Sequence, residues 1–278
     1  MTIETPEPTQ TQSDVLYEVN DRVATITFNR PHAYNAYTTD TLARLHEAFR
    51  RAMWDDEVGV VVLTGAGRSA FCTGGDVKEY AEYYVAHPEQ FRKYMVRFQD
   101  CLDAIRQMGK PTIARLNGMA VGGGNEFNMA CDLAVAADHI TIRQVGARVG
   151  SVAAGGGTQW LPIMVGDRRA REMLFLCEPI GAAQALDWGL VNRVVPYDDL
   201  DATVREMSDK LLEKFPDCLS YTQCQVNYWK DQAWYATIGH AREWLALHFG
   251  HEETAEGMRA FVEKRKPDYA EVRRRRHP

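Results

Sequence analysis

Asn117-Gly-Met-Ala-Val-Gly-Gly-Gly-Asn-Glu-Phe-Asn-Met-Ala-Cys131 joins an apolar run to a segment with helical character, and three consecutive glycines separate the two. Because glycine has no Cβ, the chain can turn tightly at 122–124 and leave free N–H groups at the start of a helix. Such a turn favours an anion, or an oxygen that becomes anionic in a transition state, and Glu126 follows close enough to act on the same ligand. The same glycines would also allow a helix to pack closely on a strand. The stretch alone therefore leaves an anion site and a packing turn as alternatives.

Strands and helices alternate on both sides of this stretch, which predicts an α/β fold. Residues 15–19 and 23–28 are predicted to form a hairpin. Residues 58–63 are predicted to form a strand buried on both faces, because the run is continuously apolar. A helix is expected from Thr38, which can cap it, to about residue 55. Further strands are expected at 111–116, 133–137, 141–144 and 191–195, and further helices at 77–84, 91–105, 200–215, 219–228, 234–249 and 252–264.

The chain divides into four expected segments with a soft boundary at Pro196. These are a flexible N-terminal arm at 1–14, a sheet-containing core at 15–196, a helical region at 197–269 and a basic tail at 270–278. The tail contains Arg273 to Arg276 and is expected to be solvated or disordered.

Composition excludes several classes of function. The formal net charge of -6 opposes a general role in binding nucleic acid. The six cysteines form no CxxC pair and have no ligand spacing with histidine, so reduced thiols and no metal site are expected. The polar start of the chain is unlike a secretory signal, and no apolar run reaches the roughly 20 residues that span a bilayer. We therefore expect a cytoplasmic protein without nucleic-acid or membrane partners.

Four short motifs follow one another along the chain: Asn29-Arg-Pro31, Ala70-Phe-Cys-Thr-Gly-Gly-Asp76, Gly122-Gly-Gly-Asn-Glu126 and Gly155-Gly-Gly-Thr-Gln159. Each is weak alone, but the ordered set resembles the crotonase family, also called the enoyl-CoA hydratase/isomerase superfamily. The resemblance runs from about residue 15 to 269. It implies a crotonase (ClpP-like) spiral of ββα units, a C-terminal helical region that forms a homotrimer or a dimer of trimers, and acyl-CoA thioester substrates. CoA would be part of the substrate, and no separate cofactor is implied.

The resemblance also implies the residues that carry the chemistry. The N–H groups of Gly75 and Gly123 would stabilise the oxygen of a thioester enolate, and Glu126 matches the first of two catalytic glutamates. A plain strand-to-helix turn at Gly75, and a Glu126 that only complements the helix dipole, are the alternatives. The position of the second glutamate holds Gly146, so simple hydration by two carboxylates loses one partner.

Other polar residues are weaker candidates. Ser151 would bind a substrate carbonyl or water, although a serine in such a loop also satisfies local backbone groups. Tyr80 and Tyr84 would donate phenolic hydrogen bonds to the substrate, or would serve only in packing. The expected binding residues are completed by the glycine-turn positions Thr73, Gly74, Asp76 and Gly122 and, for the phosphates of CoA, by Arg30, Lys264 and Lys266.

Within the family, two branches share further residues with this chain. Gln144-Val-Gly146 and Arg148 to Ser151 resemble the branch of naphthoate synthase and 2-ketocyclohexanecarboxyl-CoA hydrolase, but the aspartate that follows the serine there is missing from Val152-Ala-Ala154. Tyr34 to Thr39 and Lys78 to Tyr84 resemble the 6-oxocyclohex-1-ene-1-carbonyl-CoA hydrolase branch, as does Cys177-Glu-Pro179. This likeness implies addition of water to a conjugated ring, followed by retro-Claisen opening of the ring by a second water. An ordinary enoyl-CoA hydratase or isomerase with one glutamate, and a catalytically reduced acyl-CoA-binding protein, remain the alternatives.

Overall fold

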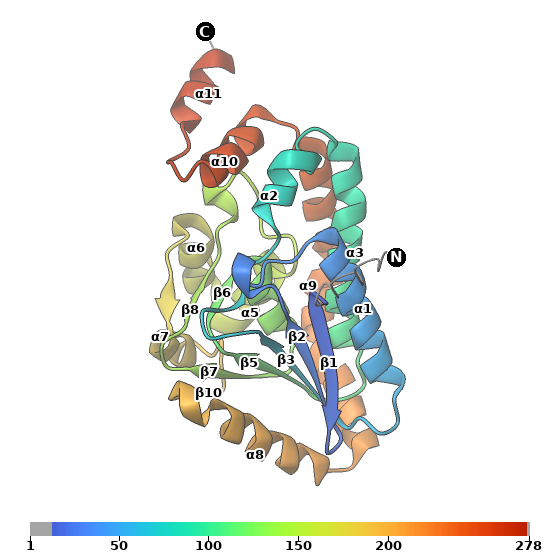
Figure 1. Cartoon of the computed structure of the whole chain (residues 1–278). Helices are drawn as coiled ribbons and strands as arrows, with labels where there is room; N and C mark the ends of the chain where they lie inside the picture. The colour runs from blue at the N-terminus through green and yellow to red at the C-terminus, as the bar shows by residue number, and fades with distance from the viewer. Residues whose placement is uncertain (1–12, 277–278) are drawn as a thin grey trace, which may run out of the picture.

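The computed structural model describes residues 13–276, so nearly all of the expected arm at 1–14 lies outside the described residues (Figure 1). Two sheets form the centre of the molecule. The larger sheet contains, in spatial order, β1 (Val15–Asn20), β2 (Val23–Phe28), β3 (Val60–Gly65), β5 (Thr112–Leu116), β7 (Leu133–Ala137) and β10 (Arg193–Val195). The smaller sheet contains β4 (Ala70–Cys72), β6 (Met119–Val121), β8 (Thr141–Arg143) and β9 (Ile180–Gly181). Strand β1 is antiparallel to β2, and β9 is antiparallel to β8, while the other neighbours are parallel.

From β3 to β8, successive strands alternate between the two sheets, which produces the expected ββα repeat. The chain passes from β3 to β4, from β5 to β6 and from β7 to β8, and helices follow each pair. Each turn of the spiral thus adds one strand to each sheet. The predicted α/β spiral is confirmed.

Burial follows the pattern of side chains along each strand. All six residues of β3 are buried, as expected for a strand with both faces covered. Alternate residues of β2, namely Ala24, Ile26 and Phe28, are buried, because β2 turns only one face to the core.

Helices cover the sheets and carry part of the site. Helix α1 (Thr39–Trp54) starts where the Thr38 hydroxyl accepts a hydrogen bond of 3.2 Å from Thr41 N, as the sequence predicts. Helix α3 (Pro88–Arg106) packs between α1 and the long helix α9 (Pro216–His248) (Figure 1).

The two helices expected at 219–228 and 234–249 are wrong as separate elements, because α9 continues through the intervening residues. These residues contain no glycine or proline, and their polar side chains have partners. Lys230 Nζ donates to Met129 O at 2.9 Å, and the carboxylate of Asp231 accepts from buried Arg106 on α3. Arg106 also donates to Asp103 at 2.6 Å, so its buried charge is paired and connects the two helices.

The remaining helices complete the outer layer and extend to the C-terminal end. Beyond α2 (Val77–Glu79) and the π-helical turn η2 (Tyr80–Tyr84) they are α4 (Gly123–Ala130), α5 (Gly157–Val165), α6 (Asp167–Leu176), α7 (Ala182–Asp187), α8 (Leu200–Leu212), α10 (Glu252–Val262) and α11 (Tyr269–Arg276), with short turns η1 (Pro31–Ala33), η3 (Gly146–Arg148) and η4 (Tyr197–Asp199). Arg273 to Arg275 are exposed as expected, but they lie on α11, whose Val272 is buried, so the tail is helical through residue 276.

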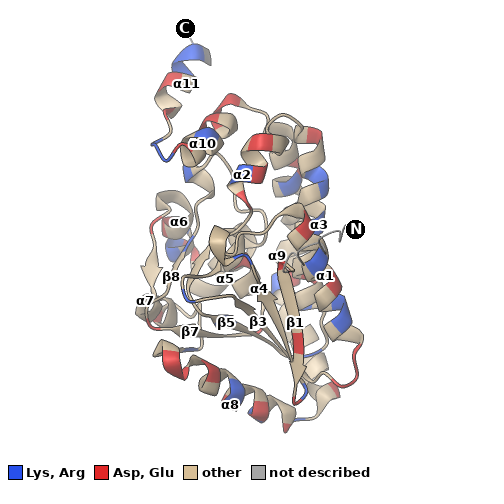
Figure 2. Ribbon diagram, in the orientation of Figure 1, with Lys and Arg blue, Asp and Glu red and all other residues tan. Residues whose placement is uncertain are grey.

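Charged side chains of both signs are mixed along the outer helices, as α8 and α11 show (Figure 2). Among residues 13–276, no helix is both long and apolar enough to cross a membrane. The boundary near Pro196 and the assembly into trimers stay predictions.

Candidate active site

A pocket lies where the two glycine turns, the loop at 144–154 and helices α3, α9 and α10 meet. Its cavity volume is about 100 Å³, and it opens to solvent. Apolar side chains form most of its walls, including Phe91, Met95, Phe98, Leu245 and Met258. Of the described residues that line it, Glu126 is the only carboxylate.

The first glycine turn, Gly122 to Gly124, connects β6 to α4. A different structural constraint explains the glycine at each of its three positions. Gly122 has a positive φ of 54°, which glycine adopts without strain. A Cβ on Gly124 would lie 1.9 Å from the carbonyl oxygen of Cys72, so Gly124 allows the helix to pack on β4. A Cβ on Gly123 would lie 2.0 Å from the hydroxyl of Tyr37, inside the pocket. The packing alternative thus explains Gly124, while Gly123 faces the site.

The second glycine turn follows β4 and lies against the first. A Cβ on Gly74 would be 3.1 Å from Gly123 N, so the two turns are in van der Waals contact. Among the described residues, the N–H groups of Gly75 and Gly123 donate no hydrogen bond. Two unpaired donors therefore lie on one wall of the pocket.

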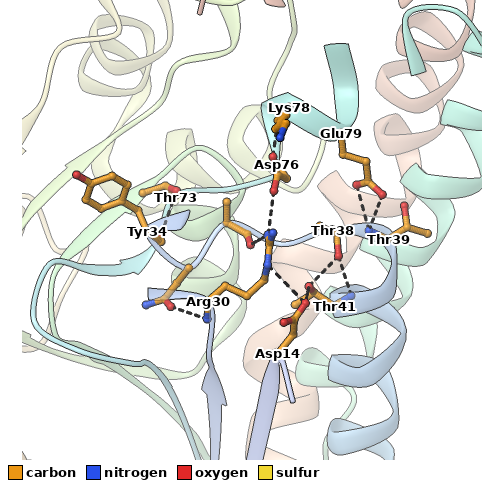
Figure 3. A network of polar contacts seen from close by, with 12 residues as sticks. Asp14, Arg30, Tyr34, Thr38, Thr39, Thr41, Thr73, Asp76, Lys78 and Glu79 are labelled. Atoms are coloured by element: carbon orange, nitrogen blue, oxygen red, sulfur yellow. Dashed lines mark hydrogen bonds and ion pairs between the residues drawn. The ribbon is translucent and has the colours of Figure 1, made fainter. Parts of the chain in front are cut away.

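An ion pair and main-chain bonds hold the second turn in place (Figure 3). Tyr37 N donates to Gly74 O, and Asp76 N donates to Tyr37 O, both at 2.9 Å. Arg30 Nη1 donates to the Asp76 carboxylate at 2.9 Å and to the carbonyl oxygen of Ala36 at 2.5 Å, and its Nε lies 3.5 Å from the Asp14 carboxylate. Segment 30–37 thus fixes the backbone on both sides of Gly75.

Glu126 lies in the first turn of α4 and is 3% exposed. Its Oε1 accepts hydrogen bonds from Gly155 N at 2.8 Å and Gly157 N at 2.9 Å. Burial raises the pKa of Glu126 to about 7, although the two N–H donors partly oppose the shift. In the part of the chain that the structure describes, Oε2 accepts no hydrogen bond and is left for a ligand.

The raised pKa predicts that Glu126 makes folding less favourable at high pH. Between about pH 4.5 and 7 the folded protein retains a proton that the unfolded chain has lost, so the free energy of unfolding falls as pH rises through this window. The loss is expected to reach about 3 kcal/mol above pH 7. Urea unfolding at pH 4.5 and pH 8 should show this difference between the wild type and Glu126→Gln, whose amide still accepts from both glycines. Equal pH dependence in the two proteins would show that Glu126 has an ordinary pKa.

The loop at 144–154 brings no second carboxylate into the pocket. A Cβ on Gly146 would lie 3.0 Å from Ser151 O and 3.1 Å from the Cα of Val152, so the loop closes over this position. Gln144 of this loop lines the pocket with 1% exposure, and its Nε2 is a buried donor without a partner in the described structure. Such a donor costs about 1 to 3 kcal/mol unless a ligand or water accepts from it.

Three tyrosines line the pocket, and a fourth does not. The hydroxyls of Tyr80 and Tyr94 share a hydrogen bond of 2.5 Å, and Tyr37 lies beside Tyr94 with stacked rings 6.5 Å apart. The Tyr84 hydroxyl instead bonds to Thr39 Oγ1 at 2.6 Å, outside the residues that line the pocket.

The structure brings together most of the residues that the sequence singles out, and separates others. Those that line the pocket are Thr73, Gly74, Gly75, Tyr80, Gly122, Gly123, Glu126 and Ser151. Ser151 Oγ donates to the neighbouring Val152 O at 3.4 Å, which fits the alternative that it satisfies local backbone. Arg30, Asp76 and Tyr84 lie behind the turn, and Lys264 and Lys266 are exposed beyond α10.

Sequence reasoning missed Tyr37, Tyr94 and Gln144 as residues of the pocket. Tyr37 and Gln144 belong to motifs noticed for their resemblance, but nothing in the sequence shows which way their side chains point. Tyr94 follows helical spacing and resembles a core residue.

Known proteins resemble the chain over most of its length. The Enoyl-CoA hydratase/isomerase family model matches residues 18–273. The chain is 37% identical to a 6-oxocyclohex-1-ene-1-carbonyl-CoA hydrolase of Geobacter metallireducens, over 90% of this chain and 78% of the relative. A protein of the same name from Thauera aromatica is 35% identical, over 89% of this chain and 78% of the relative. A solved enoyl-CoA hydratase from Mycobacterium avium subsp. paratuberculosis K-10 has a TM-score of 0.84 and 26% identity, covering 92% of this chain and 98% of that one.

Proposed function

The chain belongs to the enoyl-CoA hydratase/isomerase family and is an enzyme that acts on acyl-CoA thioesters, and from this premise we propose that it opens a cyclic 6-oxo acyl-CoA by adding water. The proposed substrate resembles 6-oxocyclohex-1-ene-1-carbonyl-CoA, the compound in the names of the two relatives. The observation that carries the proposal is a single buried carboxylate, Glu126, in the same pocket as two unpaired N–H donors.

The two N–H groups are suited to an enolate. Attack next to a thioester moves an electron pair onto the thioester oxygen, and donors fixed in advance stabilise that charge without reorganisation. Gly75 and Gly123 provide such donors from two turns in contact, and Arg30 and Asp76 fix the second turn, which contains Gly75, from behind. In this account Arg30 and Asp76 are positioning residues.

The first step adds water across the conjugated double bond. Ionised Glu126 takes a proton from water, the water oxygen bonds to the β-carbon, and the electron pair of the double bond moves to the thioester as an enolate. Glu126 then gives its proton to the α-carbon. One water has been added, and Glu126 has returned to its ionised state.

The second step opens the ring with another water. Glu126 again takes a proton as the water oxygen bonds to the ring ketone, and the tetrahedral adduct collapses to a carboxylic acid. The bond between the ketone carbon and the α-carbon breaks, and its electron pair forms the thioester enolate held by Gly75 and Gly123. Glu126 returns the proton to the α-carbon.

One carboxylate is sufficient for both steps, because each takes one proton from water and returns one to the same carbon. A pKa of about 7 gives Glu126 both protonation states near neutral pH, which suits a group that acts as base and then as acid. Gln144 Nε2 supplies an unpaired donor on the wall where the family has a second glutamate, and it can hold the water.

An acyl-CoA panel tests the proposed function. Incubation with 6-oxocyclohex-1-ene-1-carbonyl-CoA should give a CoA thioester heavier by two waters, whereas crotonyl-CoA should be hydrated slowly or not at all. A product heavier by one water, together with fast hydration of crotonyl-CoA, would identify an ordinary enoyl-CoA hydratase. Binding of both thioesters without turnover would identify an acyl-CoA-binding protein, and release of free CoA would identify a thioesterase.

A further inference from the structure

Tyr37 contacts both glycine turns of the site at once. Its main chain bonds to Gly74 and Asp76 on the two sides of Gly75. Its side chain crosses to the other turn, where the hydroxyl occupies the place that a Cβ on Gly123 would take, within 2.0 Å of that position. One residue therefore positions the Gly75 turn and brings a hydroxyl next to Gly123.

The Tyr37 hydroxyl is held in place but has no partner. Its ring stacks on Phe98 at 5.3 Å and meets Phe127 edge to face at 5.6 Å, so it cannot turn away. The hydroxyls of Tyr80 and Tyr94 bond to each other, whereas that of Tyr37 makes no hydrogen bond within residues 13–276. Tyr37 lines the pocket, so its hydroxyl is available as a donor to a ligand there.

The position of the Tyr37 hydroxyl indicates which oxygen of the substrate it binds. Two N–H groups are assigned to the single oxygen of a thioester enolate, so a third donor beside them is suited to a second oxygen close by. A β-keto thioester has such an oxygen, because its ketone is separated from the thioester carbonyl by one carbon. A simple enoyl or saturated acyl group has none, and it would leave the phenol unpaired.

We propose that the Tyr37 hydroxyl donates a hydrogen bond to the ketone oxygen of a β-keto acyl-CoA and selects this class of substrate. The inference rests on the proposed function and deepens it. When water adds to the ketone carbon, that oxygen becomes an alkoxide, and Tyr37 stabilises it until the carbon–carbon bond breaks. The charge then passes to the thioester oxygen at Gly75 and Gly123, and the former ketone oxygen remains in the new carboxylic acid.

The environment of Tyr37 fits a donor and not a base. Burial raises the pKa of Tyr37 well above its ordinary value, and the nearby carboxylate of Glu126 adds to the shift. The phenol is therefore neutral and keeps its proton throughout turnover. Glu126 remains the group that moves protons.

The test compares Tyr37→Phe with the wild type on ligands with and without the second oxygen. Ring opening of 6-oxocyclohex-1-ene-1-carbonyl-CoA should slow by about 10- to 100-fold, as expected for a lost hydrogen bond to a charged oxygen. Deuterium exchange at the α-carbon of cyclohexanecarboxyl-CoA, which has no ketone, should change by less than about threefold. Tyr17→Phe is the matched control, because the Tyr17 hydroxyl likewise has no hydrogen-bond partner in the described structure but lies on β1, outside the pocket.

Binding distinguishes failure of this inference from failure of the proposed function. The wild type should bind acetoacetyl-CoA about tenfold more tightly than butyryl-CoA, and Tyr37→Phe should lose that preference while its melting temperature stays at or above that of the wild type. If the preference is present but the ring is not opened, the proposed reaction fails and the role of Tyr37 stands. If the preference is absent from the wild type, or survives in Tyr37→Phe, the role of Tyr37 is overturned.

Discussion

Glu126→Gln is expected to lower turnover of the ring substrate by at least about 1000-fold while acyl-CoA affinity changes by only a few-fold. Glutamine keeps the size of the side chain, and its amide oxygen still accepts from Gly155 N and Gly157 N. It cannot take a proton from water or return one to carbon, and general acid–base catalysis contributes about 10²- to 10⁴-fold for each such transfer. Steady-state turnover and the Kd of a saturated acyl-CoA measure the two effects separately.

Glu79→Gln is the matched control for this variant. Glu79 is also a partly buried carboxyl near the site, and burial raises the pKa of Glu79, but it accepts from Thr39 N and does not line the pocket (Figure 3). Turnover should stay within a few-fold in Glu79→Gln. If Glu126→Gln also retains turnover, Glu126 is not the proton carrier.

Gly75→Ala is expected to lower turnover by about 100- to 1000-fold. A methyl group there would lie 1.7 Å from the hydroxyl of Tyr80 and 2.6 Å from that of Tyr94. The Tyr80 ring cannot retreat, because it packs against Tyr94 at 5.3 Å and against Phe249 at 5.5 Å. The turn must therefore move and take the Gly75 N–H out of position, and loss of one such donor costs about 3 kcal/mol in the transition state.

The structural effect of Gly75→Ala should be smaller than its effect on catalysis. Overpacking at one site commonly costs about 1 to 3 kcal/mol of folding free energy, so the variant should fold. Gly181→Ala is the control, because a Cβ at Gly181 meets no atom within 4 Å, and both its stability and its turnover should match the wild type. Wild-type turnover in Gly75→Ala would show that the N–H of residue 75 has no catalytic role.

Much of the fold and part of the site could be predicted from the sequence, because glycine turns leave a strong local signature. Gly122 to Gly124 and Gly74-Gly75 mark the ends of β6 and β4, and strands that follow each other in one spiral bring such turns together. Glu126 could be predicted as a site residue because it lies in the first turn of α4, directly after the glycine turn. The order of the motifs was sufficient to predict the family.

The remainder depends on contacts between distant residues. The bond from the Arg30 guanidinium to Asp76, 46 residues away, has no local signal in the sequence. The direction of the Tyr37 side chain depends on the path of segment 30–37 around the Gly75 turn, and no local pattern encodes that path. The continuity of α9 likewise depends on a buried partner, since Arg106 lies on α3 and Asp231 on α9.

The most direct test of the account is turnover of 6-oxocyclohex-1-ene-1-carbonyl-CoA in D₂O, with deuterium counted at the α-carbon of the product. The substrate has no hydrogen on that carbon, and each of the two steps delivers one proton to it from solvent through Glu126. We predict a ring-opened thioester with two deuterons on the α-carbon. A product with one deuteron there, or with none, would contradict enolate formation in both steps.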